Sequence, residues 1–107
     1  MKKNILKYNI MEISVFLNNI KQEFLDSCNL YHPKQIGNNI TIYKEGVDIP
    51  DLENFQLAII GVEEDRNSFG NEGCKYAPNA IRKSLYQLFY HWNDLSIIDL
   101  GNIKTGF

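Results

Sequence analysis

The sequence predicts an α/β protein built around one βαβ unit, and three segments carry that prediction. Residues 57–62 form a near-continuous apolar run, which is the pattern of a strand covered on both faces of a sheet. Residues 96–100 form a second β-prone run, and an amphipathic segment that starts with a proline lies between the two runs. Two such strands joined by a helix are expected to be parallel, with a right-handed crossover.

The helix between these strands is expected to begin at Pro78 and to end near residues 91–93. Proline suits the first turn of a helix, because the N–H that it lacks would have no intrahelical partner there. Apolar residues then recur at helical spacing, and we expect them to form the buried face: Ile81, Leu85, Leu88, Phe89 and Trp92.

A second amphipathic helix is predicted near the N-terminus. Asn9 and Glu12 have the spacing of a capping box, in which two residues three apart satisfy each other's backbone N–H groups. The helix is expected to end near residues 27–29, before Pro33. Its packing face is predicted from apolar residues at helical spacing: Ile13, Phe16, Leu17, Ile20 and Phe24.

The remaining segments divide the chain into two parts. Residues 40–43 predict a short edge strand, and residues 45–54 have the composition of a connector. We therefore separate residues 1–54, which hold the helix, short strand and connector, from residues 55–107, which hold the βαβ unit of an incomplete domain. Two parallel strands leave unpaired edges and uncovered faces, so we expect a longer parent chain or a partner to complete the sheet.

Composition excludes several classes of function. The chain has 107 residues, enough for one domain, and its formal net charge of -2 lacks the basic excess typical of nucleic-acid-binding proteins. No apolar run approaches the roughly 18 residues that cross a bilayer, and the N-terminal stretch lacks the apolar region of a secretory signal. We therefore expect a cytoplasmic protein with no nucleic-acid or membrane partner, in which Cys28 and Cys74 are reduced thiols.

The loop between the first predicted strand and its helix is the candidate functional segment. It spans residues 63–77, whereas connections of this kind usually have roughly 2–6 residues. It also leaves the carboxyl end of a parallel strand, where open α/β sheets bind ligands. Gly61, Gly70 and Gly73 lack the spacing of a dinucleotide-binding turn, and the G-K-[ST] sequence of a phosphate-binding loop is absent.

Other kinds of site find less support in the residues. A zinc site would have to combine Cys28, His32, Cys74 and His91, but their spacings do not form two matching ligand pairs. As a nucleophile, Cys74 has no base near it in the sequence, which favours a structural thiol. The acidic residues 63–65 follow the strand directly, but adjacent side chains diverge and do not by themselves make an acid–base pair.

Five short motifs follow one another in the second half of the chain: I-I-G-V (59–62), E-D-R-N (64–67), N-E-G-C (71–74), A-P-N-A-I-R (77–82) and I-D-L-G-N-I (98–103). Their order and spacing resemble the N-terminal portion of the ureohydrolase superfamily, the family of arginases, agmatinases and formimidoylglutamases, and most of all its formimidoylglutamase-type branch. The resemblance covers roughly residues 55–106. It departs at Glu63, where many members have proline, and at Ala77, which replaces the glycine of a common G-P pair.

The resemblance implies an arginase-like fold of three layers, α/β/α, around a parallel sheet, to which this chain contributes the N-terminal part and an extra N-terminal helix. It also implies two manganese ions that activate a bridging hydroxide for attack on the carbon of a guanidino or formimino group. The family's metal ligands lie in GGxH, D-x-H-x-D and D-x-D motifs, and none of these occurs in this sequence. No metal ligand or catalytic residue is therefore assigned to this chain.

The resemblance does assign residues in the loop: Asp65, Arg66, Asn67 and Glu72 are candidates for substrate-side or loop-ordering roles. Arg82 matches the A-I-R position, where we expect a structural ion pair or a tether between helix and loop. The expected function is that of an N-terminal fragment of a manganese-dependent ureohydrolase. Such a fragment would be inactive alone, and the complete enzyme is expected to be a homo-oligomer that acts on a small-molecule substrate. The alternative is a non-catalytic binding or assembly module that completes its sheet on a partner chain.

Overall fold

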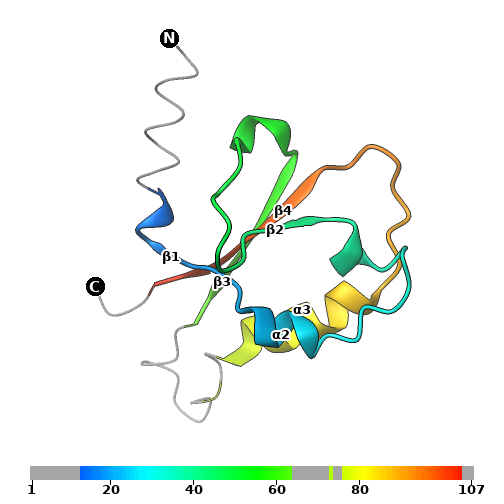
Figure 1. The fold of residues 1–107 in the computed structure, drawn as a ribbon, viewed down its shortest axis with the longest axis horizontal. Coiled ribbons are helices and arrows are strands. Elements are labelled where there is room, and N and C mark those ends of the chain that lie inside the picture. The colour runs from blue at the N-terminus through cyan, green and yellow to red at the C-terminus, as the bar shows by residue number, and fades with distance from the viewer. Residues whose placement is uncertain (1–12, 64–72, 74–75, 105–107) are drawn as a thin grey trace.

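Strand β4 (Ile97–Ile103) is the centre of a mixed four-stranded sheet in the computed structural model, which describes residues 13–63, 73 and 76–104. Strand β3 (Leu57–Val62) runs parallel to β4 along one edge. Two short strands pair with different parts of the other edge of β4 (Figure 1). Strand β1 (Leu17–Asn18) is antiparallel to β4, and strand β2 (Thr41–Ile42) is parallel to it. The predicted α/β class, the parallel strand pair and the short strand near residues 40–43 are confirmed.

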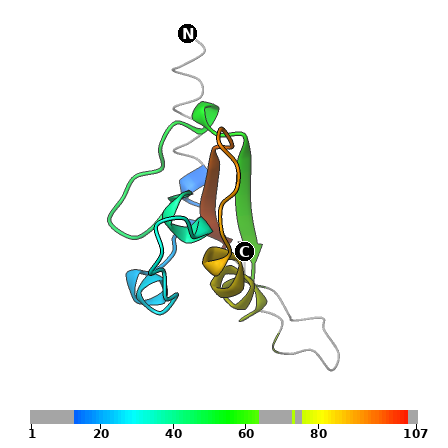
Figure 2. The same cartoon turned by 90° about the vertical axis from the view of Figure 1, so that its right-hand side faces the viewer.

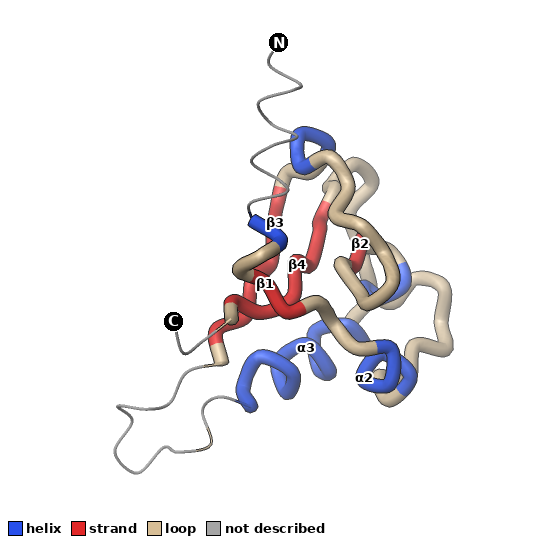
Figure 3. The backbone as a smooth tube through the Cα atoms, turned by 60° about the vertical axis from the view of Figure 1, so that its left-hand side comes forward, coloured by secondary structure: helices blue, strands red, loops and turns tan. Residues whose placement is uncertain are grey.

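Helices α2 and α3 and two 3-10 helices lie beside this sheet in the described part of the chain, in addition to the helical residues 13 and 14. Helix α3 (Ala77–Gln87) connects β3 to β4 and has its proline in the first turn, as predicted. It crosses the carboxyl-terminal half of both strands (Figure 3). Helix α2 (Gln22–Asp26) and the 3-10 helices η1 (Ile36–Asn38) and η2 (Leu52–Asn54) are short. None of the described helices is long and apolar enough to cross a membrane.

The two faces of β4 have different chemistry. Ile98 and Leu100 pack with Leu17 in the apolar core, over which the segment leading from β2 to β3 is folded (Figure 2). Asp99 points to the opposite face, toward α3, because successive side chains of a strand alternate between faces. The apolar core is completed by partly buried residues: Ile13, Tyr43, Ile49, Leu52 and Phe55. The face under α3 therefore holds the buried carboxylate of Asp99, and Ile97 shares that face.

The prediction of one continuous N-terminal helix is wrong. Among the residues that the structure describes, which begin at Ile13, Ile13 and Ser14 are helical before a turn leads into β1, and a separate helix, α2, follows at Gln22–Asp26. The edge of β4 explains the difference: the Lys104 N–H donates to the Phe16 carbonyl at 2.8 Å, and Leu17 enters the apolar core. The end of the helical segment near residues 27–29 is confirmed, whereas Asn9 and Glu12 lie outside the described residues.

The predicted apolar face of α3 is also wrong. The helix ends at Gln87, because the next residues pair with another segment: the Ile36 N–H donates to the Leu88 carbonyl at 2.6 Å. The side chains that α3 buries are Arg82 and Tyr86. Most of the expected apolar residues are exposed instead: Ile81, Leu88, Phe89 and Trp92. The helix is thus turned so that Arg82 meets the carboxylate of Asp99 on β4.

Strand β3 has the predicted bounds but not the predicted burial. Leu57, Ile60 and Val62 are 51%, 46% and 54% exposed, although the sequence pattern is that of a strand covered on both faces. Within the described residues, β3 pairs only with β4, so its outer edge carries no neighbouring strand (Figure 2). An irregularity between Ile59 and Gly61 shifts the register along the inner edge.

Candidate functional site

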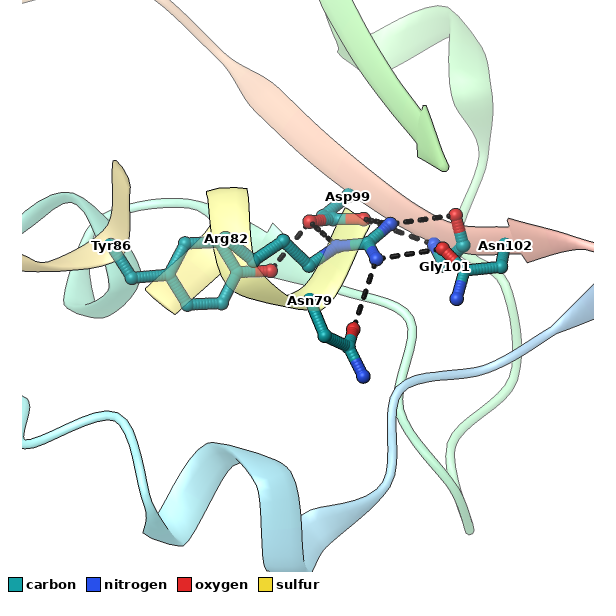
Figure 4. Close-up of polar contacts among 6 residues, drawn as sticks. All are labelled: Asn79, Arg82, Tyr86, Asp99, Gly101 and Asn102. Atoms are coloured by element: carbon teal, nitrogen blue, oxygen red, sulfur yellow. Dashed lines mark hydrogen bonds and ion pairs between the residues drawn. The ribbon is translucent and has the colours of Figure 1, made fainter. Parts of the chain in front are cut away.

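The candidate site lies where β3 and β4 end and α3 begins. The loop residues assigned from the family resemblance, Asp65, Arg66, Asn67 and Glu72, fall outside the described residues, as does Cys74. The structure does describe the two elements that flank this loop, the end of β3 and the start of α3. A network of buried polar side chains connects the first two turns of α3 to the carboxyl-terminal half of β4 (Figure 4).

Arg82 and Asp99 are the centre of this network. The Arg82 Nε donates to Asp99 Oδ2 at 2.8 Å, and its Nη2 donates to Asp99 Oδ1 at 3.0 Å. This bidentate geometry matches the planar guanidinium to the planar carboxylate and gives stronger hydrogen bonds than a neutral pair. The sequence prediction of a structural ion pair at Arg82 is confirmed.

The remaining donors of Arg82 are also used. Nη1 donates to the side-chain oxygens of Asn79 at 3.2 Å and Asn102 at 2.7 Å, and Nη2 also donates to the Gly101 carbonyl at 2.8 Å. A guanidinium carries five N–H groups, and each has an acceptor here. Arg82 therefore has no donor left for a substrate.

Asp99 is equally saturated. Beside its two bonds from Arg82, Oδ2 accepts from the Tyr86 hydroxyl at 2.5 Å, and Oδ1 accepts from the Gly101 N–H at 3.0 Å. A carboxylate offers about four acceptor positions, so none remains for proton transfer to a ligand. Burial, reinforced by the charge of Asp99 and the hydrogen bond to it, raises the pKa of Tyr86 far above its ordinary value. The hydroxyl is thus held as a neutral donor.

Two glycines make room for the network. A Cβ added at Gly61 on β3 would lie 2.0 Å from Asn102 Oδ1 and 2.8 Å from the Cβ of Pro78. Gly101 has a φ of +81°, and a Cβ there would lie 2.2 Å from the carbonyl oxygen of Asn18 on β1. Glycine is needed at both positions because the neighbouring atoms approach the backbone too closely for any side chain.

The sequence held a signal for this network beyond Arg82. Asp99 stands inside the apolar run of β4, and a buried carboxylate needs a charged partner and hydrogen bonds. Arg82 is the cation that α3 brings over that face. Asn79, Tyr86 and Asn102 have no comparable local signal, since their roles depend on how α3 is turned.

The described residues offer neither a metal site nor a reactive thiol. Among the described residues, no group of three or more His, Cys, Asp and Glu side chains could hold a metal ion. Cys28, His32 and His91, the described members of the zinc site considered from the sequence, form no such group. Cys28 is a free, buried thiol whose Sγ donates to the Phe24 carbonyl at 3.3 Å, and burial raises its pKa. A thiol of that kind is a poor nucleophile.

Two open grooves lie away from the network. One, of about 510 Å³, lies between α2 and β2 and has Asp26 and Lys44 as its charged lining residues. The other, of about 520 Å³, lies at the amino-terminal start of β4 and includes Tyr90 and Asp94. This second groove is at the end of the sheet opposite to the one where open α/β sheets bind ligands. Neither groove brings an acid, a base and a nucleophile together.

No family model, curated protein or solved structure matches this chain. A functional assignment therefore depends on the motifs in the sequence and on how the structure arranges them.

Proposed function

We propose that this chain forms the N-terminal part of a cytoplasmic, manganese-dependent hydrolase of the ureohydrolase type, with an arginase-like α/β/α fold. Its substrate class would be a guanidino or formimino compound. One observation carries the proposal: three of the motifs that resemble the family, although separated in sequence, contact one another in a single cluster around the buried Arg82–Asp99 pair. The cluster is drawn from I-I-G-V (Gly61), A-P-N-A-I-R (Asn79, Arg82) and I-D-L-G-N-I (Asp99, Gly101, Asn102).

The position of the cluster supports a role for the adjoining loop. That loop leaves β3 just beyond Gly61 and rejoins the chain at the first turn of α3, so the cluster holds both of its attachment points. In the proposed enzyme, Asp65, Arg66, Asn67 and Glu72 lie on this loop at the substrate side. The saturated Arg82–Asp99 pair is the support of the site and takes no part in the chemical step.

The described residues do not fit a manganese site, because they contain no suitable group of ligands. In the proposal the metal ligands belong to the GGxH, D-x-H-x-D and D-x-D motifs of the family, which this sequence lacks. No step of the hydrolysis is therefore assigned to a residue of this chain.

A chimeric enzyme tests the proposal. Residues 55–104 of this chain would replace the corresponding segment of a formimidoylglutamase, and manganese-dependent hydrolysis of formimidoylglutamate, arginine and agmatine would be measured. We expect the chimera to turn over one of these substrates, while the chain alone shows no turnover above a metal-only blank. A matched chimera with Glu72→Ala tests the loop. A folded chimera that is inactive on all three substrates would contradict the proposal.

The open edge of β3 favours a second candidate, a non-catalytic module that completes its sheet on a partner chain. Leu57, Ile60 and Val62 are about half exposed beside an edge that has no neighbour in the described residues. The nucleotide sequence after the Phe107 codon separates the two candidates. An open frame that continues into GGxH and D-x-H-x-D motifs supports the enzyme, whereas a stop codon without them supports the module.

A further inference from the structure

The groove between α2 and β2 has two walls of regular structure. The helix wall is one face of α2, because its residues are spaced i, i+3 and i+4: Gln22, Leu25 and Asp26. The strand wall is one face of the extended chain through β2, because its residues alternate: Ile40, Ile42 and Lys44. Each wall thus combines apolar side chains with one charged side chain. The volume of about 510 Å³ falls within the range of roughly 300–1,000 Å³ that is usual for small-molecule sites.

Hydrogen bonds hold the two walls together at one end of the groove. The Ile20 N–H donates to the Tyr43 carbonyl at 3.0 Å, and the Glu45 N–H donates to the Ile20 carbonyl at 3.1 Å. The Gln22 N–H, at the start of α2, donates to Glu45 Oε1 at 3.1 Å. Lys44 stands between Tyr43 and Glu45 in the chain, so it lies at the end of the groove where α2 begins.

Residues 29–38 close the other end of the groove. Asn29 has a φ of 55°, a left-handed conformation that turns the chain just after α2. The Tyr31 hydroxyl donates to Asn29 Oδ1 at 2.9 Å, which ties the ring to the groove although Tyr31 is 87% exposed. Leu30 packs against Gly37, where an added Cβ would lie 2.6 Å from Leu30 Cδ1. This end therefore offers aliphatic and aromatic surface that an apolar ligand can cover.

The two charged residues of the lining lie at different positions along the groove. Asp26 is about one turn further along α2 than Gln22, and one helical turn rises about 5.4 Å. Gln22 Nε2 donates to Asp26 Oδ1 at 3.0 Å and orients that carboxylate. Glu45, the acid next to Lys44 in the chain, is bound instead by the Gln22 N–H and by Lys21, whose Nζ is 4.0 Å from Glu45 Oε2. The groove thus has a cation at one end and an anion further along, with apolar surface beside them.

We infer that this groove binds a zwitterionic short peptide with apolar side chains. The peptide carboxylate pairs with Lys44, its ammonium group pairs with Asp26, and its side chains lie against the apolar walls. Opposite charges in one groove favour a ligand that carries both charges over a ligand that carries one. An α-amino acid has both charges on the same carbon, whereas the two ends of a dipeptide match the offset along α2. The site is independent of the proposed hydrolase, because it lies within residues 22–44, outside the part that resembles the ureohydrolases.

A titration followed by NMR tests the inference. The full chain, labelled with ¹⁵N and kept dilute enough to be monomeric, is titrated with the dipeptide leucyl-leucine. The N-acetylated dipeptide, which lacks the ammonium group, and the C-amidated dipeptide, which lacks the carboxylate, are titrated in parallel. We expect saturable shifts of backbone N–H signals in residues 22–44, with β3 unaffected, and about fivefold weaker binding of each blocked form. This difference should shrink at high salt, because salt screens exposed charges.

Two variants assign the charges of the ligand to the two walls. Asp26→Asn keeps an oxygen for Gln22 and should bind the free and the N-acetylated dipeptide equally well, while it still prefers a free carboxylate. Lys44→Met should show the converse preference. Asp48→Asn and Lys34→Met remove the same charges from exposed residues outside the groove and should keep both preferences. Each expected result is a ratio of affinities within one variant, so a change in stability does not imitate it.

Two results would overturn the inference. The first is a set of shifts that do not saturate with leucyl-leucine, or equal affinities for the free and blocked dipeptides. The second is an Asp26 or Lys44 variant that keeps both preferences of the natural chain.

Discussion

Arg82 and Asp99 form a bidentate ion pair whose side chains are 2% and 0% exposed, so the bond between α3 and β4 is sealed from solvent. The free energy of placing either charge alone in this position is high, because the interior does not solvate ions as water does. Hydrogen bonds to neighbouring groups offset the cost of burying the two charges: Arg82 donates to Asn79, Gly101 and Asn102, and Asp99 accepts from Tyr86 and Gly101. The orientation of α3 therefore brings a polar contact to the sheet, and the expected apolar stripe does not face it.

Removing the negative charge should strongly destabilise the fold. Asp99→Asn leaves the guanidinium of Arg82 buried without a counter-ion, and we expect the free energy of unfolding to fall by about 3–5 kcal/mol. Urea denaturation followed by circular dichroism measures the change. Asp94→Asn is the matched control at an exposed residue, with an expected effect within about 0.5 kcal/mol. Equal effects of the two substitutions would show that the ion pair does not hold α3 in place.

Alkaline pH should destabilise the protein through Tyr86. Its pKa is raised in the folded state, chiefly by burial and next by Asp99, whereas an unfolded tyrosine loses its proton near pH 10. The stabilisation is complete below about pH 10 and decreases above it by about 1.4 kcal/mol per pH unit, because the unfolded state then binds fewer protons than the folded state. Denaturation midpoints measured from pH 9 upward should fall less steeply in Tyr86→Phe than in the natural protein.

Tyr31→Phe is the control for this pH series, since Tyr31 is 87% exposed. Its midpoints should fall with the same slope as those of the natural protein. Parallel curves for Tyr86→Phe and the natural protein would mean that the Tyr86 hydroxyl is not held protonated by its surroundings.

Local patterns predicted the parts of this fold that local forces decide. The bounds of β3 and the start of α3 follow from an apolar run and from Pro78, whose effects act within a few residues. An ion pair at Arg82 was also predictable, although its partner was not named. A buried cation on a helix that packs against a strand needs a partner of opposite charge.

Contacts distant in sequence decided the rest. Strand β1 exists because Leu17 pairs with Ile103, a contact that no local periodicity near Leu17 reports. The apolar face of α3 was misplaced because the need of Asp99 for a cation turns Ile81 outward. The place of Asn102 in the network depends in turn on the direction of the Arg82 guanidinium, so it could not be predicted from the sequence near Asn102.

Gly61 should not tolerate a side chain. Gly61→Ala places a Cβ 2.0 Å from Asn102 Oδ1 and 2.8 Å from the Cβ of Pro78, so either the network or α3 must move. We expect a loss of about 1–3 kcal/mol in the free energy of unfolding, the usual cost of overpacking. Gly73→Ala is the matched control, because a Cβ at Gly73 meets no atom within 4 Å. A neutral effect at both positions would show that β3 can shift away from the network without cost.

The outer edge of β3 should make the chain associate as its concentration rises. Leu57–Val62 carries no charge, and unpaired edges of this kind recruit further strands. Ile60→Lys places a charge on that edge and should increase the monomer fraction in sedimentation velocity at equal protein concentration. Ser84→Lys adds the same charge on the exposed side of α3 and should leave association unchanged. If both variants associate like the natural protein, the contact between chains lies elsewhere, and the exposed residues at the end of α3, Leu88 and Phe89, become the surface to substitute next.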